Sequence, residues 1–156
     1  MKNRLIEINA LKRAVSGKRV LIDSNIIIYL TEQTEPYWQL SQALFSMVEQ
    51  GDCSAVISII SVSEVMQGPL RAGKTDAAMA VKNYLGNFPN CDCQHVTDEV
   101  LDQVGTDERV NWGILRSADS LIIASGLHVG TDLFISNDRH FVMSLPAKML
   151  LSLHAR

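Results

Sequence analysis

Residues 19–30 read RVLIDSNIIIYL and contain the pattern that decides the fold. The apolar run RVLI (19–22) predicts a short buried strand of the kind found in parallel sheets that are covered on both faces. Asp23 ends this strand, and Ser24 is expected to cap a short helix through IIIYL. A buried strand that leads directly into a helix is typical of a β-α-β unit.

Strands and helices are expected to alternate along the rest of the chain. Further strands are predicted at 54–60 (SAVISII), 92–96, 132–136 (DLFIS) and 148–153. Helices are predicted at 3–16, from Pro36 to about Gln50, from Ser61, at 75–85, from Asp98 toward Asn111, and at 117–128. This order predicts an α/β fold in three layers, with helices on both faces of a mainly parallel sheet of four or five strands.

Length and composition indicate one globular domain. The chain has 156 residues, of which 47 % are apolar and 20 % charged, close to the average for soluble domains. No apolar run is long enough for a membrane span, and none resembles a signal peptide. The three cysteines cannot all pair within one chain. A cytoplasmic protein is therefore expected.

The net charge of −3 is unevenly distributed. Residues 1–19 carry a balance of +5, whereas the remaining residues carry −8. We therefore divide the chain into a basic amphipathic N-terminal extension (1–18) and a main domain (19–156). The apolar positions of the extension favour helical packing onto the body over contact with phosphates. The acidic total alone disfavours a nucleic-acid partner.

Four acidic residues lie either at the ends of predicted strands or in the first turns of predicted helices. Asp23 lies at the end of the first strand, and Asp138 follows the fourth. Asp119 lies in the first turn of a predicted helix, and so does Glu64, three residues after Ser61. Because the carboxyl ends of parallel strands and the helices that follow them share one edge of a sheet, the four acids are expected to converge.

Each of these acids also has a purely structural interpretation. Asp23 and Asp138 suit turns, Glu64 completes a capping box, and Asp119 complements a helix dipole. Converging carboxylates, however, repel one another unless they take up protons or a cation. Oxygen ligands favour Mg²⁺ or Mn²⁺, and such a site suits hydrolysis of phosphodiesters by metal-activated water.

The segments that carry the acids resemble those of the PIN-domain ribonucleases, especially the VapC-type toxins of bacterial toxin–antitoxin pairs. The matching segments are VLIDSNIIIYL (20–30), ISIISVSEVMQG (57–68), SADSLIIASG (117–126) and DLFISNDRHF (132–141). Their order and spacing agree from about residue 19 to the end of the chain.

The resemblance implies a three-layer α/β/α PIN fold and an endoribonuclease that depends on Mg²⁺ or Mn²⁺. It implies that Asp23 and Asp119 are the principal metal ligands. Glu64 and Asp138 would bind the metal secondarily or through water. All four acids are then catalytic candidates.

Further residues receive supporting roles. By resemblance, Ser136 and Asn25 support the acidic cluster. Arg116 and Arg139 flank the two later motifs and are candidates for phosphate contact, with a solvated surface role as the alternative. The family also implies an RNA substrate, an antitoxin partner and a homodimer, with the apolar residues of 25–48 at the contacts. Simple core burial is the alternative for those apolar residues.

Other functions remain open. A PIN-fold protein without an antitoxin could process RNA or act as a non-catalytic binding module. A Mg²⁺-binding signalling module of receiver type is disfavoured because the strand at 54–60 does not end in aspartate. Cys91, Cys93 and His95 alternate as zinc ligands on a strand could, but their spacing favours ordinary packing.

Overall fold

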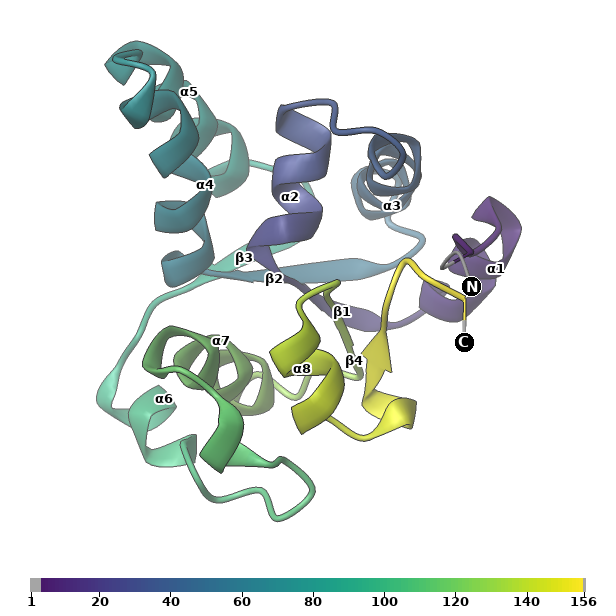
Figure 1. The fold of residues 1–156 in the computed structure, drawn as a ribbon, viewed down its shortest axis with the longest axis vertical. Coiled ribbons are helices and arrows are strands. Elements are labelled where there is room, and N and C mark those ends of the chain that lie inside the picture. Colours follow the sequence, from purple (N-terminus) through teal and green to yellow (C-terminus); the bar gives the residue numbers. More distant parts are fainter. Residues whose placement is uncertain (1–3, 156) are drawn as a thin grey trace.

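The chain folds around a five-stranded sheet whose strands all run parallel, in the order β3-β2-β1-β4-β5 (Figure 1). The computed structural model describes residues 4–155. The strands are β1 (Arg19–Ile22), β2 (Ser54–Ser58), β3 (Cys91–Gln94), β4 (Leu133–Ile135) and β5 (Leu150–Leu151). The predicted parallel sheet is confirmed.

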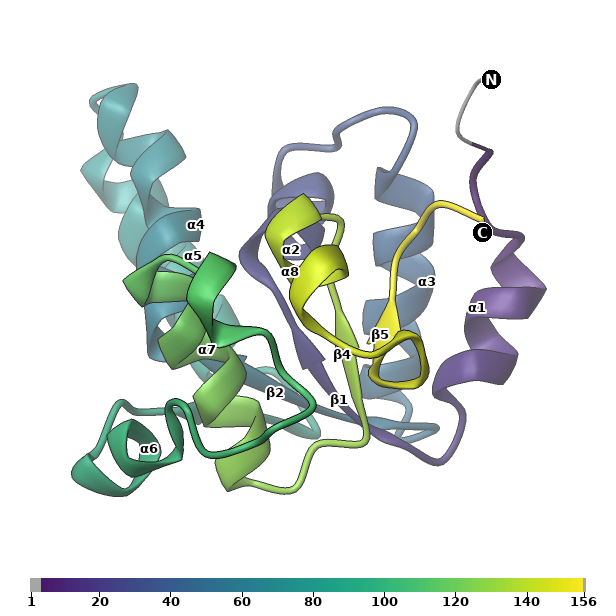
Figure 2. The ribbon, with the colours of Figure 1, turned by 60° about the horizontal axis from the view of Figure 1, so that its bottom comes forward.

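Helices cover both faces of the sheet, which gives the predicted three layers (Figures 1 and 2). Helices α2 (Ser24–Thr31), α3 (Trp38–Glu49), α4 (Ile59–Arg71) and α5 (Thr75–Gly86) lie on one side, beside α1 (Ile8–Val15). On the other side lie α6 (Asp98–Gln103), α7 (Ser117–His128) and α8 (Arg139–Ser144). Short 3₁₀ turns occupy Trp112–Ile114 and Ala147–Met149.

Strand β1 is buried on both faces and joins the two halves of the core. Val20 and Ile22 belong to the apolar cluster under α1 to α4, whereas Leu21 belongs to the cluster under α7 and α8. This alternation follows from the period of two along a strand. It explains why the segment that decides the fold is apolar without interruption.

The N-terminal helix is shorter than predicted. The pattern predicts a helix over 3–16, but α1 begins at Ile8, because the residues before it pair with the C-terminal segment. The backbone N–H of Ile6 donates to the carbonyl of Leu153 at 2.9 Å. The predicted start at residue 3 and the basic Lys2 lie outside the described residues.

Two predicted helix caps are wrong. Asp23 rather than Ser24 caps α2, because its side chain accepts a hydrogen bond from the backbone of the next residue. Helix α4 begins at Ile59 rather than at Ser61, and Ser58 caps it. Ser61 lies buried inside the helix, so the predicted capping box with the acid three residues later does not form.

The segment before α7 also differs from expectation. Helix α6 ends at Gln103 instead of running toward Asn111, and turns follow it. The short helix α8 was not predicted. Among residues 4–155, no helix combines the length and apolar character that a membrane crossing requires.

Candidate active site at the carboxyl edge of the sheet

Asp23 and Ser136 face each other at the ends of two adjacent strands. They follow β1 and β4, which pair in register, so the two side chains meet. The Ser136 hydroxyl donates to Asp23 Oδ2 at 2.6 Å, and Asn25 Nδ2 donates to the same oxygen at 3.0 Å. The other oxygen, Oδ1, accepts from the Ser24 backbone at 2.8 Å. Both carboxylate oxygens of this buried aspartate are therefore hydrogen-bonded.

Ser136 also connects this pair to Asp138. The backbone N–H of Asp138 donates to the Ser136 hydroxyl oxygen at 2.9 Å. The Asp138 carboxylate caps α8 by accepting from the backbone of His140 at 2.7 Å. The imidazole Nδ1 of His140 lies 3.3 Å from the same carboxylate oxygen. One hydroxyl thus fixes the positions of two of the predicted acids.

Asp119 reaches the same place from α7. It is buried in the first turn of that helix, as predicted. Asp119, Asp138 and His140 each offer one ligand atom, and these atoms lie within 4.8 Å of one another. The sequence favours a structural role for His140 over an approach to substrate. Its place two residues after Asp138 was the signal that could have identified it.

Glu64 approaches the cluster from α4. The side chain is exposed, and it sits in the second turn of the helix rather than in the first. Partial burial raises the pKa of Glu64, and the Asp119 and Asp138 carboxylates raise it further. The Ser24 hydroxyl offsets part of this rise by hydrogen bonding to Glu64. The structure therefore brings all four predicted acids into one electrostatic neighbourhood.

The pKa of Asp23 is raised mainly by its burial. Burial raises the pKa of Asp23 from 3.8 to about 6, although hydrogen bonds from Ser136 and Ser24 oppose the rise. The negative charges of Glu64 and Asp138 add to it. A buried carboxylate among other acids is stabilised in its charged form by a neighbouring cation.

The two predicted phosphate contacts differ in their surroundings. Arg116 directly precedes α7, where its side chain forms no capping hydrogen bond, and its Nε lies 3.2 Å from Asp119 Oδ2. Its Nη2 lies 3.8 Å from Asp138 Oδ2. Arg139, the first residue of α8, is exposed and forms no ion pair within the described part of the chain. Arg116 is thus paired with two of the acids, whereas Arg139 follows Asp138 in the sequence and is solvated.

Asn137 is a supporting residue that sequence reasoning missed. Its backbone N–H donates to Asn25 Oδ1 at 3.1 Å. Its own side-chain oxygen accepts from the Ser152 hydroxyl at 3.0 Å and from the Leu153 backbone at 2.8 Å. Asn137 therefore ties the acidic edge to the C-terminal segment. Its position between two predicted site residues was the available signal.

The donor set at this edge fits a divalent cation. Carboxylate oxygens are the ligands that Mg²⁺ and Mn²⁺ prefer, and Asp119 and Asp138 each offer one such oxygen within 4.8 Å of the other. The alternating cysteines of β3 form no comparable group with His95 among residues 4–155. The chemistry that such a carboxylate cluster supports is metal-assisted hydrolysis of a phosphodiester.

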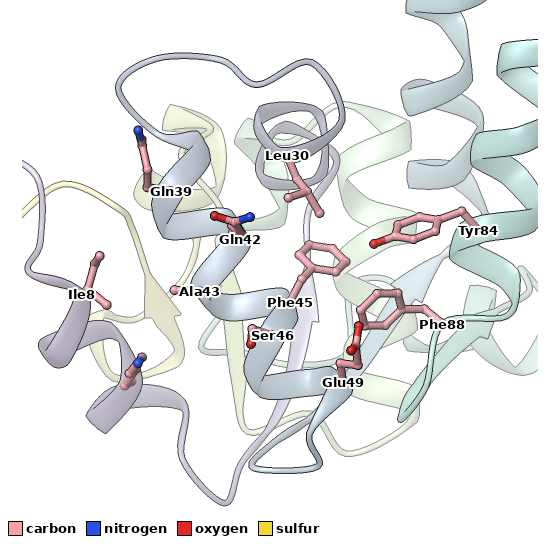
Figure 3. A pocket seen from close by; sticks show the side chains of 11 residues that line it. Ile8, Leu30, Gln39, Gln42, Ala43, Phe45, Ser46, Glu49, Tyr84 and Phe88 are labelled. Carbon is pink, nitrogen blue, oxygen red and sulfur yellow. The ribbon is translucent and has the colours of Figure 1, made fainter.

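A separate groove lies between α1, α3 and α5 (Figure 3). It has a volume of about 690 Å³ and contains none of the four acids. Phe45, Phe88 and Tyr84 lie on one side of it, and Gln39 and Gln42 on the other. We assign the candidate chemistry to the acidic edge, because hydrolysis needs converging charged groups, and the groove contains none of the four acids.

Comparison with known proteins agrees with this fold. The sequence pattern that defines the PIN domain matches residues 20–142. No curated protein matches the chain. Similar solved structures include VapBC2 from Rickettsia felis bound to a fragment of promoter DNA. That chain has 13 % identity and a TM-score of 0.61, with 86 % of this chain and 98 % of that chain covered.

Two further structures have the same architecture. VapC20 from Mycobacterium tuberculosis, a toxin that cleaves the sarcin–ricin loop, has 17 % identity and a TM-score of 0.59, with 80 % of this chain and 93 % of that chain covered. A toxin–antitoxin complex from Klebsiella pneumoniae has 19 % identity and a TM-score of 0.58, with coverages of 85 % and 95 %. At these identities the structures support the fold, and the sequence pattern supports the family. The chain belongs to the PIN domain family.

Proposed function

We propose that this protein is a metal-dependent endoribonuclease and the toxin of a VapBC-type toxin–antitoxin pair. One observation carries the catalytic part of the proposal. Four acids from distant segments, Asp23, Glu64, Asp119 and Asp138, lie within electrostatic reach of one another at the carboxyl edge of the sheet. Such a cluster is costly to fold without a cation, so its presence favours a catalytic role over four separate structural ones.

In this proposal, Asp23 and Asp119 are the principal ligands of Mg²⁺ or Mn²⁺. Glu64 and Asp138 complete the site directly or through water. A bound cation would supply Lewis-acid stabilisation of charge on the phosphoryl group. Ser136 hydrogen-bonds to Asp23 and so holds one acid in position.

The remaining side chains would orient the attack. Asn25 bonds to both Asp23 and Ser136 and is proposed to keep the cluster rigid. The Glu64 carboxylate, with its raised pKa, suits the acceptance of a proton from the attacking water. Arg116 and Arg139 are proposed to contact the phosphates on either side of the scissile bond.

The toxin part of the proposal draws on the neighbours of the fold. Similar chains come from complexes described as VapBC, including one from Salmonella typhimurium bound to DNA. We propose an antitoxin partner and a homodimer for this chain as well. Leu30 and Phe45, from the apolar region 25–48, line the groove of Figure 3, which favours that face as a contact surface. An RNA substrate implies a cytoplasmic location.

We also propose that residues 1–18 form an N-terminal extension of a PIN domain that spans 19–156. Leu11 and Val15 of α1 are completely buried. Their burial favours packing over phosphate contact as the role of the extension. The pattern match beginning at residue 20 is consistent with this division.

The catalytic part is tested by incubating the purified chain with RNA in Mg²⁺ or Mn²⁺. We expect cleavage that EDTA abolishes and that Asp119→Asn abolishes in a folded protein. Asp107→Asn is the matched control, because Asp107 pairs with Arg109 near the end of α7, whereas Asp119 lies in its first turn, so its loss should leave cleavage intact. Cleavage by Asp119→Asn at the wild-type rate would contradict the site.

The toxin part is tested separately in cells. Expression of the wild-type chain should arrest growth, whereas expression of Asp119→Asn should not. Co-expression of the protein encoded by the adjacent reading frame should relieve the arrest. Active cleavage in vitro without arrest would favour the alternative, an RNA-processing PIN protein. Metal-independent RNA binding without cleavage would favour a non-catalytic module.

A further inference from the structure

Arg116 occupies an unusual position for a surface arginine. Its guanidinium lies between two site acids, with Nε 3.2 Å from Asp119 Oδ2 and Nη2 3.8 Å from Asp138 Oδ2. The Asp119 side chain is buried, whereas the Arg116 side chain is 69 % exposed. A positive charge therefore already lies against the carboxylates that the proposed function assigns to a divalent cation.

The two positive charges cannot both use these carboxylates without cost. The ligand atoms of Asp119, Asp138 and His140 lie within 4.8 Å of one another. A cation held by them would therefore lie close to the guanidinium. Like charges at such distances repel appreciably even near a solvated surface. Either the cation or the guanidinium must move away from the carboxylates. The guanidinium can do so because it ends a flexible side chain.

The local structure permits that movement. The backbone of Arg116 is fixed as the cap of α7, with φ −75° and ψ 163°. Asp119 and Asp138 are its only ion-pair partners among residues 4–155. The rest of the side chain is solvated, so it can leave the carboxylates without breaking core packing. Its planar guanidinium also matches the geometry of a phosphate.

We propose that Arg116 is an internal counter-ion that neutralises Asp119 and Asp138 in the metal-free protein. When a divalent cation binds, it displaces the guanidinium, which then turns to the RNA phosphate. This inference rests on the proposed function and adds a coupling to it. The cation would both complete the acidic site and release a phosphate-binding side chain, so metal binding and substrate binding would support each other.

The first test measures cation binding without RNA. Mn²⁺ is titrated calorimetrically into the wild type, Arg116→Gln and Arg116→Lys. Removal of the competing charge should tighten Mn²⁺ binding about tenfold in Arg116→Gln. The lysine variant keeps the charge and should stay near the wild type. Arg109→Gln is the matched control, because Arg109 pairs with Asp107 near the end of α7 opposite to Asp119, and its loss should leave Mn²⁺ binding unchanged.

The second test follows the arginine itself and its effect on substrate. In NMR, the Nε–H signal of Arg116 should shift on saturation with Mg²⁺, while that of Arg109 should not. With saturating metal, the KM for RNA should rise in Arg116→Gln and recover in part in Arg116→Lys. An ion pair with Asp119 that only holds α7 in place would instead lower the melting temperature on its loss and leave Mn²⁺ affinity unchanged.

The possible results distinguish failure of this inference from failure of the proposed function. Unchanged or weaker Mn²⁺ binding in a folded Arg116→Gln overturns the counter-ion role while leaving the nuclease proposal intact. If neither the wild type nor any variant shows Mn²⁺ binding that depends on Asp119, the proposed function and the inference are both overturned.

Discussion

The Asp23 carboxylate is buried, and it accepts hydrogen bonds from the residues that cover it. Its position after a buried strand could be predicted, because RVLI followed by an acid is visible in the sequence. The donors could not be derived in the same way. Ser136 lies 113 positions away, and only the pairing of β1 with β4 brings its hydroxyl to the carboxylate.

The raised pKa of Asp23 predicts a pH dependence of stability in EDTA. The folded protein holds this proton more tightly than the unfolded chain does, since burial raises the pKa to about 6. Stability from this group is therefore full below about pH 4 and is lost as the pH rises through about 6, at a cost of about 3 kcal/mol. Asp23→Asn should remove that loss.

Urea unfolding of both proteins at several pH values between 4 and 7 provides the measurement. The stability difference between Asp23→Asn and the wild type should grow in favour of the variant across this range. Addition of Mg²⁺ at pH 7 should stabilise the wild type more than the variant. Parallel pH profiles in EDTA would contradict the assignment.

Helix and strand positions were predictable wherever local pattern and tertiary packing agree. Strand β1 and helix α7 have the predicted bounds. The start of α4 was mispredicted because Ser61 and Glu64 fit a capping box, whereas Ser58 ends β2 by pairing with β3 and then caps the helix. The start of α4 therefore depends on the pairing of β2 with β3, which the local sequence does not show.

Helix α7 packs unusually close to the sheet at Gly126. A Cβ at this position would lie 2.5 Å from a ring carbon of Phe134 on β4 and 3.0 Å from Leu21 on β1. Gly126→Ala should therefore destabilise the fold by about 1–3 kcal/mol through overpacking. Denaturant unfolding measures the change in the free energy of unfolding.

Gly86→Ala is the matched control for this prediction. Gly86 ends α5, and a Cβ there meets nothing within 4 Å. Since alanine favours helix, this variant should be neutral or more stable by up to about 1 kcal/mol. Equal effects of the two substitutions would contradict the close approach of α7 to the sheet.

The distribution of charge over the molecule has a different meaning once the acids are located. An acidic total disfavours nucleic acid only while the charges are treated as a uniform surface. Part of the −8 outside residues 1–19 belongs to the cluster at one edge of the sheet. If that cluster holds a cation, RNA affinity should depend on the metal rather than on net charge.

The N-terminal extension should contribute to the stability of the whole fold. Leu11 is fully buried in the larger core cluster although it precedes the matched PIN pattern. Leu11→Ala should lower the free energy of unfolding by about 2–5 kcal/mol. Ile8→Ala on the same helix should cost less than about 1 kcal/mol, because Ile8 is 43 % exposed.

Chemical denaturation of both variants checks this prediction. Similar small losses would mean that α1 is held loosely and contributes little to the free energy of unfolding.

The pairing of the two ends of the chain has a consequence for the order of synthesis. A ribosome delivers residues 4–6 well before their partners at 153–155. The side chain of Asn137, next to Asp138, likewise waits for Ser152 and Leu153. A nascent chain that is released before Ser152 is synthesised contains all four acids. It lacks the hydrogen bonds between Asn137 and the C-terminal segment. The support of the acidic edge therefore forms only after Ser152 and Leu153 have been synthesised.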